Sequence, residues 1–160
     1  MNLYLIRHGE AEQTSENKPH ELRELTENGV EIVRTSSEFW KNFIQGFDII
    51  LSSPLIRAKQ TADIIRDVLK VKPEVAEEIS LLNGGLTEDL ISIAEAIRMN
   101  EIAMVGHQPD MGIHIASMTG TGDSNLKIPP AAIAKIHFLK NPGIGKGILE
   151  FLLPPINKKG

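Results

Sequence analysis

The sequence predicts an α/β fold: a three-layer sandwich with a mostly parallel central sheet, helices on both faces and an antiparallel hairpin at the C-terminal end. Short runs of continuously apolar residues, typical of strands buried on both faces, alternate with apolar residues spaced three and four apart, typical of helices. The last two apolar segments are instead joined by a glycine-rich loop, which is typical of a hairpin.

The first half of the chain is predicted to supply two strands and two helices. The strands are the apolar runs 3–6 and 49–51. The first helix should begin after Thr26, whose hydroxyl suits an N-cap, and end near Gly46. The second should begin at Pro54 after a cap by Ser53, because proline favours the first position of a helix.

The second half is predicted to continue this alternation and then to end in the hairpin. Thr87 is the expected cap of a third helix, and residues 102–105 form the next buried strand. A short helix should follow over residues 109–119. Residues 133–139 and 148–153 are the two strands of the hairpin.

Composition limits the classes of protein that fit. A length of 160 residues with 41% hydrophobic and 24% charged residues suits one globular domain, residues 1–160. No apolar run approaches the roughly 18 residues of a membrane span. A net charge of −4 and 4% aromatic residues disfavour membrane surfaces and nucleic acid as partners. The lack of cysteine excludes disulfides and thiolate nucleophiles and fits a reducing cytoplasm, so we expect a cytoplasmic protein. The basic end at Lys158 and Lys159 is expected to be frayed.

Histidine and arginine side chains follow three of the predicted strands. Arg7 and His8 come directly after the first strand, Arg57 follows the second, and His107 follows the strand after the third helix. Because ligands bind beyond the carboxyl ends of parallel strands, we expect these four side chains to form one site. The glycine beside each histidine is expected to leave room for the ligand.

The residue types indicate phosphate chemistry. Arg57 is predicted in the first turn of a helix, where the positive end of the helix dipole disfavours a cation unless an anion binds there too. A neutral His8 beside an arginine-held phosphoryl group would attack phosphorus and form a covalent phosphohistidine, which water then hydrolyses. Arg7, Arg57 and His107 would stabilise the charge. The spacing of histidines and carboxylates contains no metal motif, so we expect neither a metal nor another cofactor.

Three motifs carry a resemblance to a known family: Arg7-His8-Gly9, Ser53-Pro54-x-x-Arg57-Ala58-x-Gln60-Thr61-Ala62 and Gly106-His107-x-Pro109-Asp110. In this order they resemble the histidine phosphatase superfamily, which includes phosphoglycerate mutase. The short chain and its Arg23-Glu24-Leu25-Thr26 segment resemble the small bacterial branch, the SixA-type phosphohistidine phosphatases.

The resemblance implies a phosphoglycerate mutase-like fold and a role for each matching residue. His8 would be the phosphorylated nucleophile and His107 its partner, Arg7 and Arg57 would clamp the phosphate, and Arg23 would be a more distant pocket arginine. The implied substrate is a phosphohistidine on a protein.

The chain departs from the mutases in two ways. Residues 81–85 contain no acid where the mutases are expected to carry a glutamate proton donor, and Glu77, Glu78 and Glu88 lie nearby but outside the pattern. The long insertions that cover the mutase pocket are also missing. Both departures favour a protein substrate, because an open groove admits it and an imidazole leaving group is able to carry its own proton.

Alternatives remain at this stage. The chain could be a phosphatase of small phosphomonoesters, or a mutase with a different glutamate donor; from another class, it could be a phosphohistidine-binding module without turnover. Among single residues, Arg57 could be a solvated helix arginine, and Asp110 is explained by the dipole of its helix. His20, His114 and His137 belong to no motif and are expected to be structural or on the surface.

Overall fold

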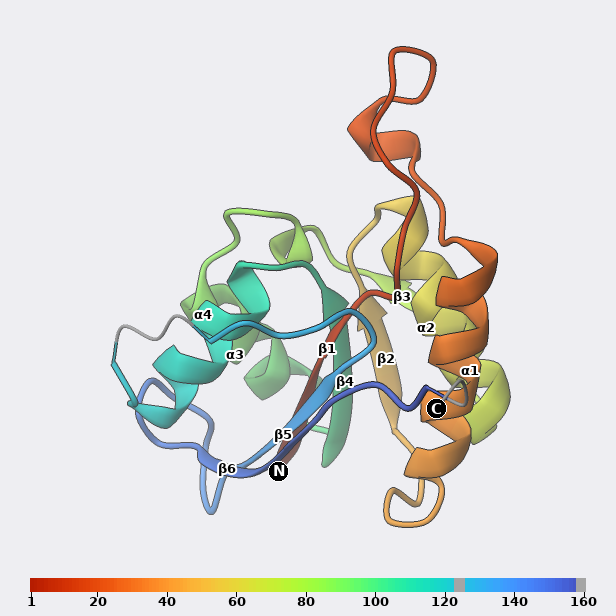
Figure 1. Ribbon diagram of the computed structural model, residues 1–160. Helices are drawn as coiled ribbons and strands as arrows, with labels where there is room; N and C mark the ends of the chain where they lie inside the picture. Colours follow the sequence, from red (N-terminus) through yellow and green to blue (C-terminus); the bar gives the residue numbers. More distant parts are fainter. Residues whose placement is uncertain (123–125, 158–160) are drawn as a thin grey trace.

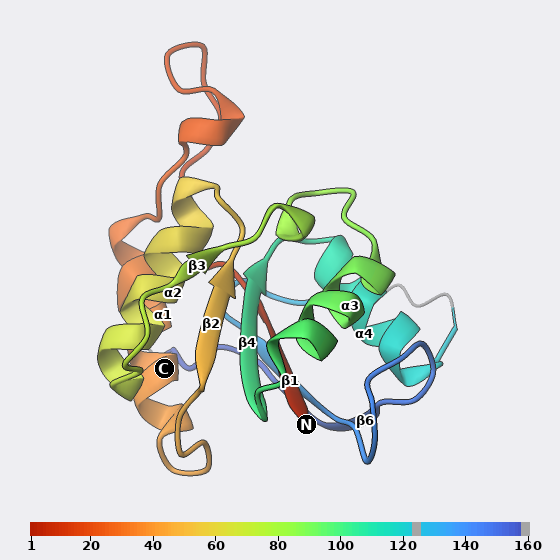
Figure 2. The same ribbon diagram turned by 180° about the vertical axis from the view of Figure 1, so that it is seen from behind.

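A computed structural model describes residues 1–122 and 126–157 of the chain (Figures 1 and 2). The strands are β1 (Asn2–Arg7), β2 (Ile49–Ser52), β3 (Ala76–Glu77), β4 (Glu101–Gly106), β5 (Ile133–His137) and β6 (Ile148–Leu153). The α-helices are α1 (Glu27–Trp40), α2 (Ile56–Leu69), α3 (Thr87–Ile97) and α4 (Asp110–Thr119). Two short 3-10 helices cover His20–Leu22 and Ile79–Leu81.

The described strands form one mixed sheet in the order β3-β2-β4-β1-β5-β6. Strands β3, β2, β4 and β1 pair in parallel, whereas β5 is antiparallel to both β1 and β6. The predicted fold class, with its mostly parallel sheet and C-terminal antiparallel hairpin, is therefore confirmed. The carboxyl ends of β1, β2 and β4 lie at the same edge of this sheet because the three strands run in the same direction.

Each face of the sheet is covered by two helices, α1 and α2 on one side and α3 and α4 on the other (Figure 1). Side chains alternate between the two cores: Leu3 and Leu5 pack in the α3–α4 core, and Tyr4 and Ile6 in the α1–α2 core. All four are almost completely buried. A strand between two helical layers needs apolar side chains on both faces, which explains the continuous apolar runs.

The first helix begins as predicted and ends earlier. The Thr26 hydroxyl caps it by accepting a hydrogen bond of 2.9 Å from Gly29 N. The helix stops at Trp40 rather than near Gly46, and a turn follows it. Ile44 still reaches the core from this turn, so the apolar pattern continues beyond the helix that it predicted.

Two other helix starts were predicted incorrectly. Helix α2 begins at Ile56, two residues after Pro54. The Ser53 hydroxyl contacts His107, which directly follows β4, instead of capping the helix. Leu86 takes the cap position of α3, and Thr87 is the first residue of the helix. The Thr87 hydroxyl contacts His114 of α4 instead of capping the helix. Strand β3 was not predicted, because two residues are too few to show a period.

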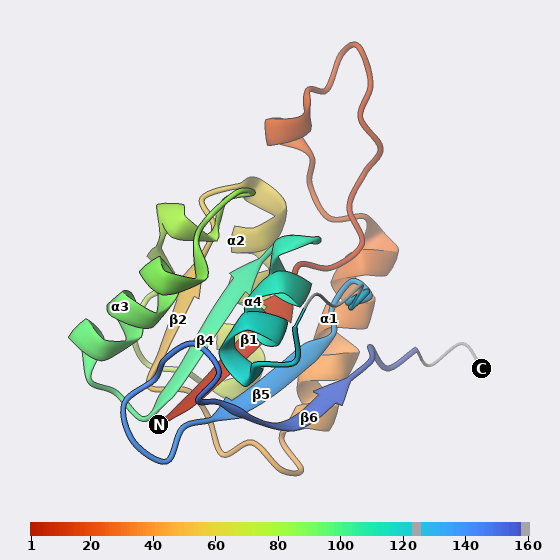
Figure 3. The same ribbon diagram turned by 90° about the vertical axis from the view of Figure 1, so that its left-hand side faces the viewer.

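Residues 11–25 leave the body of the protein between β1 and α1 and project beyond the carboxyl ends of the strands (Figures 1 and 3). An antiparallel bridge between Ala11 and Leu25 closes the base of this segment, and a second joins Ser15 to Lys18. The predicted frayed end at 158–159 lies outside the described residues. None of the helices within the described residues combines the length and apolar character needed to cross a membrane.

Candidate active site

The pairing of β1 with β4 brings two histidines together. Arg7 is opposite Gly106 in the last register position of these parallel strands, and His8 N donates a hydrogen bond of 3.0 Å to Gly106 O. His8 and His107 follow directly. Their ring centroids are 5.1 Å apart and their planes are inclined by 58°.

The His8 ring is held as a neutral imidazole with a defined proton position. It is 8% exposed, and its Nδ1 is 2.7 Å from the carbonyl oxygen of Gly9. Because a carbonyl only accepts, Nδ1 carries the ring proton and Nε2 keeps its lone pair. Burial, aided by the positive charges of His107, Arg57 and Arg7 and opposed by the Gly9 carbonyl, lowers the His8 pKa to about 3. Near neutral pH, Nε2 is therefore uncharged and keeps its lone pair, as a nucleophile requires.

The His107 ring contacts Ser53, which is fully buried at the end of β2. His107 Nε2 is 2.7 Å from Ser53 Oγ, and this oxygen also accepts a long hydrogen bond of 3.4 Å from Leu55 N. The serine hydroxyl is able to donate its proton to Nε2, and we assign this direction, which leaves the ring proton of His107 on Nδ1. Burial, followed by the charge of Arg57, lowers the His107 pKa to about 4.

Two arginines lie at the same edge of the sheet. Arg7 Nη1 donates a hydrogen bond of 2.7 Å to Ile128 O, and burial lowers the Arg7 pKa. Arg57, the second residue of α2, is only 1% exposed and donates from Nη1 to His20 O (2.9 Å) and from Nη2 to His20 Nε2 (2.7 Å). Burial and the charge of a second arginine lower the Arg57 pKa. The alternative of a solvated helix arginine is therefore wrong.

Three buried nitrogens of this group have no hydrogen-bond partner among the described residues: Arg7 Nε, Arg57 Nε and His107 Nδ1. Leaving a buried donor without an acceptor costs about 1–3 kcal/mol, and more for a charged group. Such donors suit a ligand with several acceptor oxygens, and guanidinium groups match the oxygens of phosphate. The arrangement is suited to binding a phosphoryl group beside a neutral histidine.

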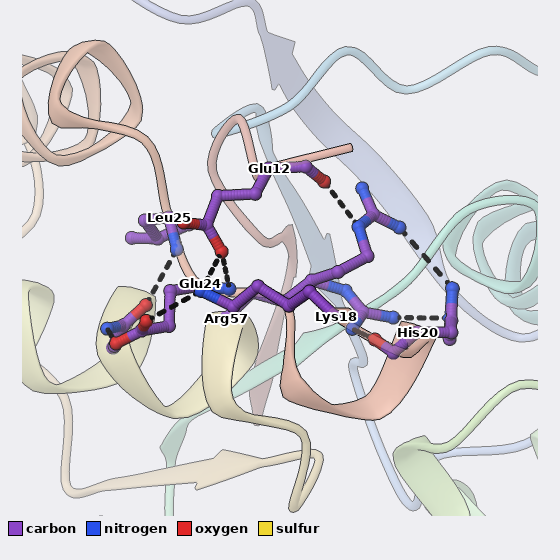
Figure 4. A network of polar contacts seen from close by, with 8 residues as sticks. Glu12, Lys18, His20, Glu24, Leu25 and Arg57 are labelled. Atoms are coloured by element: carbon purple, nitrogen blue, oxygen red, sulfur yellow. Dashed lines mark hydrogen bonds and ion pairs between the residues drawn. The ribbon is translucent and has the colours of Figure 1, made fainter. Parts of the chain in front are cut away.

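The contact of His20 with Arg57 at this edge was not predicted from the sequence (Figure 4). Besides Arg57, His20 meets Arg23, whose Nη1 is 3.4 Å from His20 Nδ1 and whose Nε donates to Glu12 O. Arg23 is thus linked to Arg57 through His20, and its role as a pocket arginine stays a prediction. The only sequence signal was the three-residue spacing of His20 and Arg23, which one 3-10 turn brings to the same side.

The other two unassigned histidines lie in structural contacts away from this group. His114 is 1% exposed, and its Nδ1 is 2.8 Å from the Thr87 hydroxyl, between α4 and α3. His137 Nδ1 is 2.8 Å from Asn2 Oδ1, near the other edge of the sheet.

Two residues of the second motif connect its helix to neighbouring loops. Thr61 Oγ1 donates a hydrogen bond of 2.7 Å to Arg57 O and accepts one of 3.0 Å from Gly9 N. Gln60 Oε1 accepts a hydrogen bond of 2.8 Å from Leu25 N at the base of the 11–25 segment. Helix α2 therefore fixes both the loop after β1 and the base of this segment.

The three glutamates considered as proton donors are occupied elsewhere or exposed. Glu77 forms an ion pair with Lys59, and the Glu78 side chain accepts a hydrogen bond of 2.9 Å from Ser80 N. Glu88 is exposed on α3. Within residues 1–122 and 126–157, no carboxylate is among the largest influences on the pKa of either site histidine.

Asp110 lies in the first turn of α4, where its charge complements the helix dipole as expected. Its Oδ2 also accepts hydrogen bonds from Gly84 N (3.0 Å) and Asn83 Nδ2 (3.1 Å), which fix the segment that lacks an acid against α4. No group of three or more histidine, aspartate or glutamate residues in the described part of the chain is placed to hold a metal ion.

The two glycines beside the histidines have a different role from the one expected. A Cβ on Gly9 would lie 2.6 Å from Val33 Cγ2, and a Cβ on Gly106 would lie 2.6 Å from Met111 Cε. Both distances are too short for real contacts, so these glycines admit core side chains of α1 and α4. The expectation that they leave room for a ligand is corrected accordingly.

Comparisons with known proteins match this architecture. The chain is 26% identical over 163 residues to "Phosphohistidine phosphatase SixA" of Escherichia coli, covering 99% of this chain and 97% of that protein. It is 33% identical over 115 residues to an uncharacterized protein of Picosynechococcus, covering 70% and 69% of the two chains. Among solved structures, "the protein histidine phosphatase SixA complexed with tungstate" has a TM-score of 0.84 at 22% identity, covering 96% of this chain and 97% of that one.

The same fold also occurs in an Escherichia coli structure described as a putative alpha-ribazole-5'-P phosphatase, with a TM-score of 0.74 at 19% identity, covering 95% of this chain and 96% of that one. The family model described as "Histidine phosphatase superfamily (branch 1)" matches residues 3–112, which include the two histidines, both arginines and most of the secondary structure. This chain belongs to the histidine phosphatase superfamily, branch 1.

Proposed function

We propose that this chain is a metal-independent phosphatase that works through a covalent phosphohistidine on His8 and removes phosphate from a phosphohistidine on a protein. Membership of the superfamily supports a phosphatase, and the name of the Escherichia coli relative supports phosphohistidine as the substrate. The geometry supports the chemistry because it combines a buried neutral imidazole with two arginines.

In the first step, the Nε2 lone pair of His8 forms a bond to phosphorus. The bond from phosphorus to the substrate imidazole breaks, and its electron pair stays on the substrate nitrogen. Arg7 and Arg57 hold the non-bridging oxygens, and His107 donates from Nδ1 to one of them. The His8 ring becomes positively charged, and its Nδ1–H bond to Gly9 O is strengthened because it is now charge-assisted.

In the second step, a water molecule attacks the phosphorus of the phosphohistidine. The bond between phosphorus and His8 Nε2 breaks, and its electron pair returns to the nitrogen. Both protons of the water remain with the product, which leaves as dihydrogen phosphate, and His8 is again the neutral Nδ1–H tautomer. The same two arginines and His107 stabilise the charge in both steps.

The leaving group distinguishes the possible substrates. A phosphomonoester expels an alkoxide, which needs a proton from the enzyme, whereas a phosphohistidine ring protonated on its second nitrogen leaves as a neutral imidazole. The observation that carries the choice is that the candidate donors are engaged elsewhere: Glu77 pairs with Lys59, Glu78 accepts from Ser80 N, and no carboxylate of the described residues is among the largest influences on the pKa of His8 or His107. A site without a neighbouring acid favours the leaving group that does not require one.

Phosphate release in EDTA tests this proposal. A phosphohistidine peptide is compared with a matched phosphoserine peptide and a small phosphomonoester, and His8→Ala is the control enzyme. We expect release mainly from phosphohistidine, lost in His8→Ala. A preference for phosphomonoesters would instead favour the small-molecule phosphatase, and phosphate transfer between substrate positions would favour a mutase. Binding of the phosphopeptide without release would favour the binding module, and a strict need for added Mg²⁺ or Zn²⁺ would contradict the mechanism.

A further inference from the structure

We propose that His20 is a positioning residue, which holds the guanidinium of Arg57 in the orientation that binds a phosphoryl group. His20 lies on the exposed 3-10 helix of the 11–25 segment, and no motif of the sequence includes it. The inference rests on the proposed function of Arg57 as a phosphate clamp and adds a residue that acts through it.

The contacts are specific on both sides. Arg57 Nη1 donates to His20 O at 2.9 Å, and Arg57 Nη2 donates to His20 Nε2 at 2.7 Å. An arginine has no acceptor, so His20 Nε2 must supply the lone pair and Nδ1 must carry the ring proton. One residue therefore takes a hydrogen from each terminal nitrogen of Arg57 and fixes the plane of the guanidinium.

This arrangement leaves the remaining donors of Arg57 for a ligand. A guanidinium has five N–H groups, and His20 takes two of them. Arg57 Nε is buried and has no partner in the described part of the chain. Because the plane is already fixed, a phosphoryl group would not have to order this side chain when it binds, which favours affinity.

The charges around His20 explain why its position matters. Its Nδ1 is 3.4 Å from Arg23 Nη1, so the ring lies between two guanidinium groups. Arg23 lowers the pKa of Arg57 through charge repulsion, and Glu21 opposes this effect. Arg23 also lowers the pKa of His107. The two hydrogen bonds to His20 therefore hold Arg57 in place against the repulsion of Arg23.

Contacts within the 11–25 segment hold His20 in place (Figure 4). Lys18 forms ion pairs with Glu12 (2.5 Å) and Glu24 (3.0 Å). Arg23 donates to Glu12 O, and Gln60 of α2 accepts from the backbone at the base of the segment. The segment is therefore fastened to the helix that carries Arg57, which keeps the two partners in register.

Binding of inorganic tungstate, measured by calorimetry, tests the proposal without requiring turnover. His20→Ala and His20→Asn should weaken binding about 3- to 10-fold, because one hydrogen bond that orients Arg57 is lost. His20→Gln should restore most of the affinity, since its amide oxygen lies near the position of Nε2, whereas the Asn oxygen lies near that of Nδ1. Glu16→Ala, an exposed change in the same segment, is the matched control and should bind like the wild type.

A double-mutant cycle separates positioning from a general structural effect. We expect His20→Ala to lower kcat/KM about 3- to 10-fold in the wild type and to have no effect in Arg57→Ala. An equal loss in both backgrounds, or wild-type tungstate affinity in His20→Ala, would overturn the proposal. Failure of the proposed function is distinct from this, because it would appear as a wild-type protein that binds tungstate but releases no phosphate.

Discussion

The two edges of the central sheet treat their polar groups in opposite ways. At the edge where the parallel strands begin, Asp48 Oδ2 accepts from the backbone nitrogens of Asn100 (3.0 Å) and Glu101 (2.9 Å). The Glu101 carboxylate accepts from Asn2 Nδ2 and from the Tyr4 hydroxyl, both at 2.6 Å. Burial and this carboxylate raise the pKa of Tyr4. The polar groups of Asp48, Glu101, Asn2 and Tyr4 are thus hydrogen-bonded to one another or to the backbone.

At the edge where the strands end, the balance is shifted toward donors. Arg7 Nε, Arg57 Nε and His107 Nδ1 are buried without acceptors among the described residues, and burial lowers the pKa of all three groups. The first edge therefore contributes to stability, whereas the unpaired donors of the second edge cost stability, as is typical of groups that bind a ligand. Variants at the two edges should therefore change different properties.

The largest effect is expected at the nucleophile. His8→Ala should lower turnover of a phosphohistidine substrate by roughly 10⁴-fold or more, because the covalent route needs the Nε2 lone pair. Phosphate release under single-turnover conditions measures this loss, and circular dichroism checks the fold. Activity above a tenth of the wild-type value would contradict the role of His8.

The next largest effect is expected at the phosphate clamp. Arg57→Ala should lower kcat/KM by about 10²- to 10³-fold, because it removes charged donors from the transition state. Steady-state kinetics and tungstate affinity measure the effect together. An unchanged rate and affinity would mean that the buried guanidinium serves the 11–25 segment alone.

The pH dependence of stability should distinguish the two histidines from ordinary ones. The folded-state pKa values of about 3 for His8 and about 4 for His107 lie below the usual value of 6.5. The unfolded chain therefore takes up protons first, and the free energy of unfolding should fall as pH falls from about 6.5 toward 4, by up to about 2 kcal/mol per histidine at pH 5.

Urea unfolding at pH 7.5 and pH 5 measures this difference. His8→Gln and His107→Gln cannot take up the extra proton in the unfolded state, so each should lose less stability than the wild type on acidification. Equal losses in all three proteins would contradict the depressed pKa values.

The smallest effect is expected at the edge where the parallel strands begin. Glu101→Gln should lower the free energy of unfolding by about 1 kcal/mol, because one of its short hydrogen bonds to Asn2 or Tyr4 is weakened. The kcat/KM should stay within about twofold, since the change is at the other end of the strands. Thermal unfolding and the kinetic assay measure both; a loss of activity without a loss of stability would break the comparison between the edges.

The sequence predicted the part of the site that depends on strand order. Buried apolar runs placed His8, His107 and the two arginines after parallel strands, and such strands end at one edge of a sheet. It did not predict the contact of His20 with Arg57. Residues 11–25 have no hydrophobic period, and their position depends on long-range contacts such as that of Gln60 with Leu25.

The roles of small residues were the other part beyond the reach of sequence patterns. The Ser53 hydroxyl resembled a helix cap in sequence, but it lies 2.7 Å from His107 in the fold. Gly9 and Gly106 were expected to leave room for a ligand, but they leave room for the core side chains of Val33 and Met111. In each case the partner belongs to a different element, so spacing along the chain could not identify it.

Trapping the phosphorylated enzyme tests the central claim most directly. The protein is mixed with radiolabelled phosphohistidine peptide, quenched in alkali within milliseconds and mapped by mass spectrometry, with His8→Asn as the control. We predict one phosphoryl group on His8, stable in alkali, lost in acid and absent from the variant. Phosphate release with no label on the enzyme, or with the label on another residue, would contradict the account.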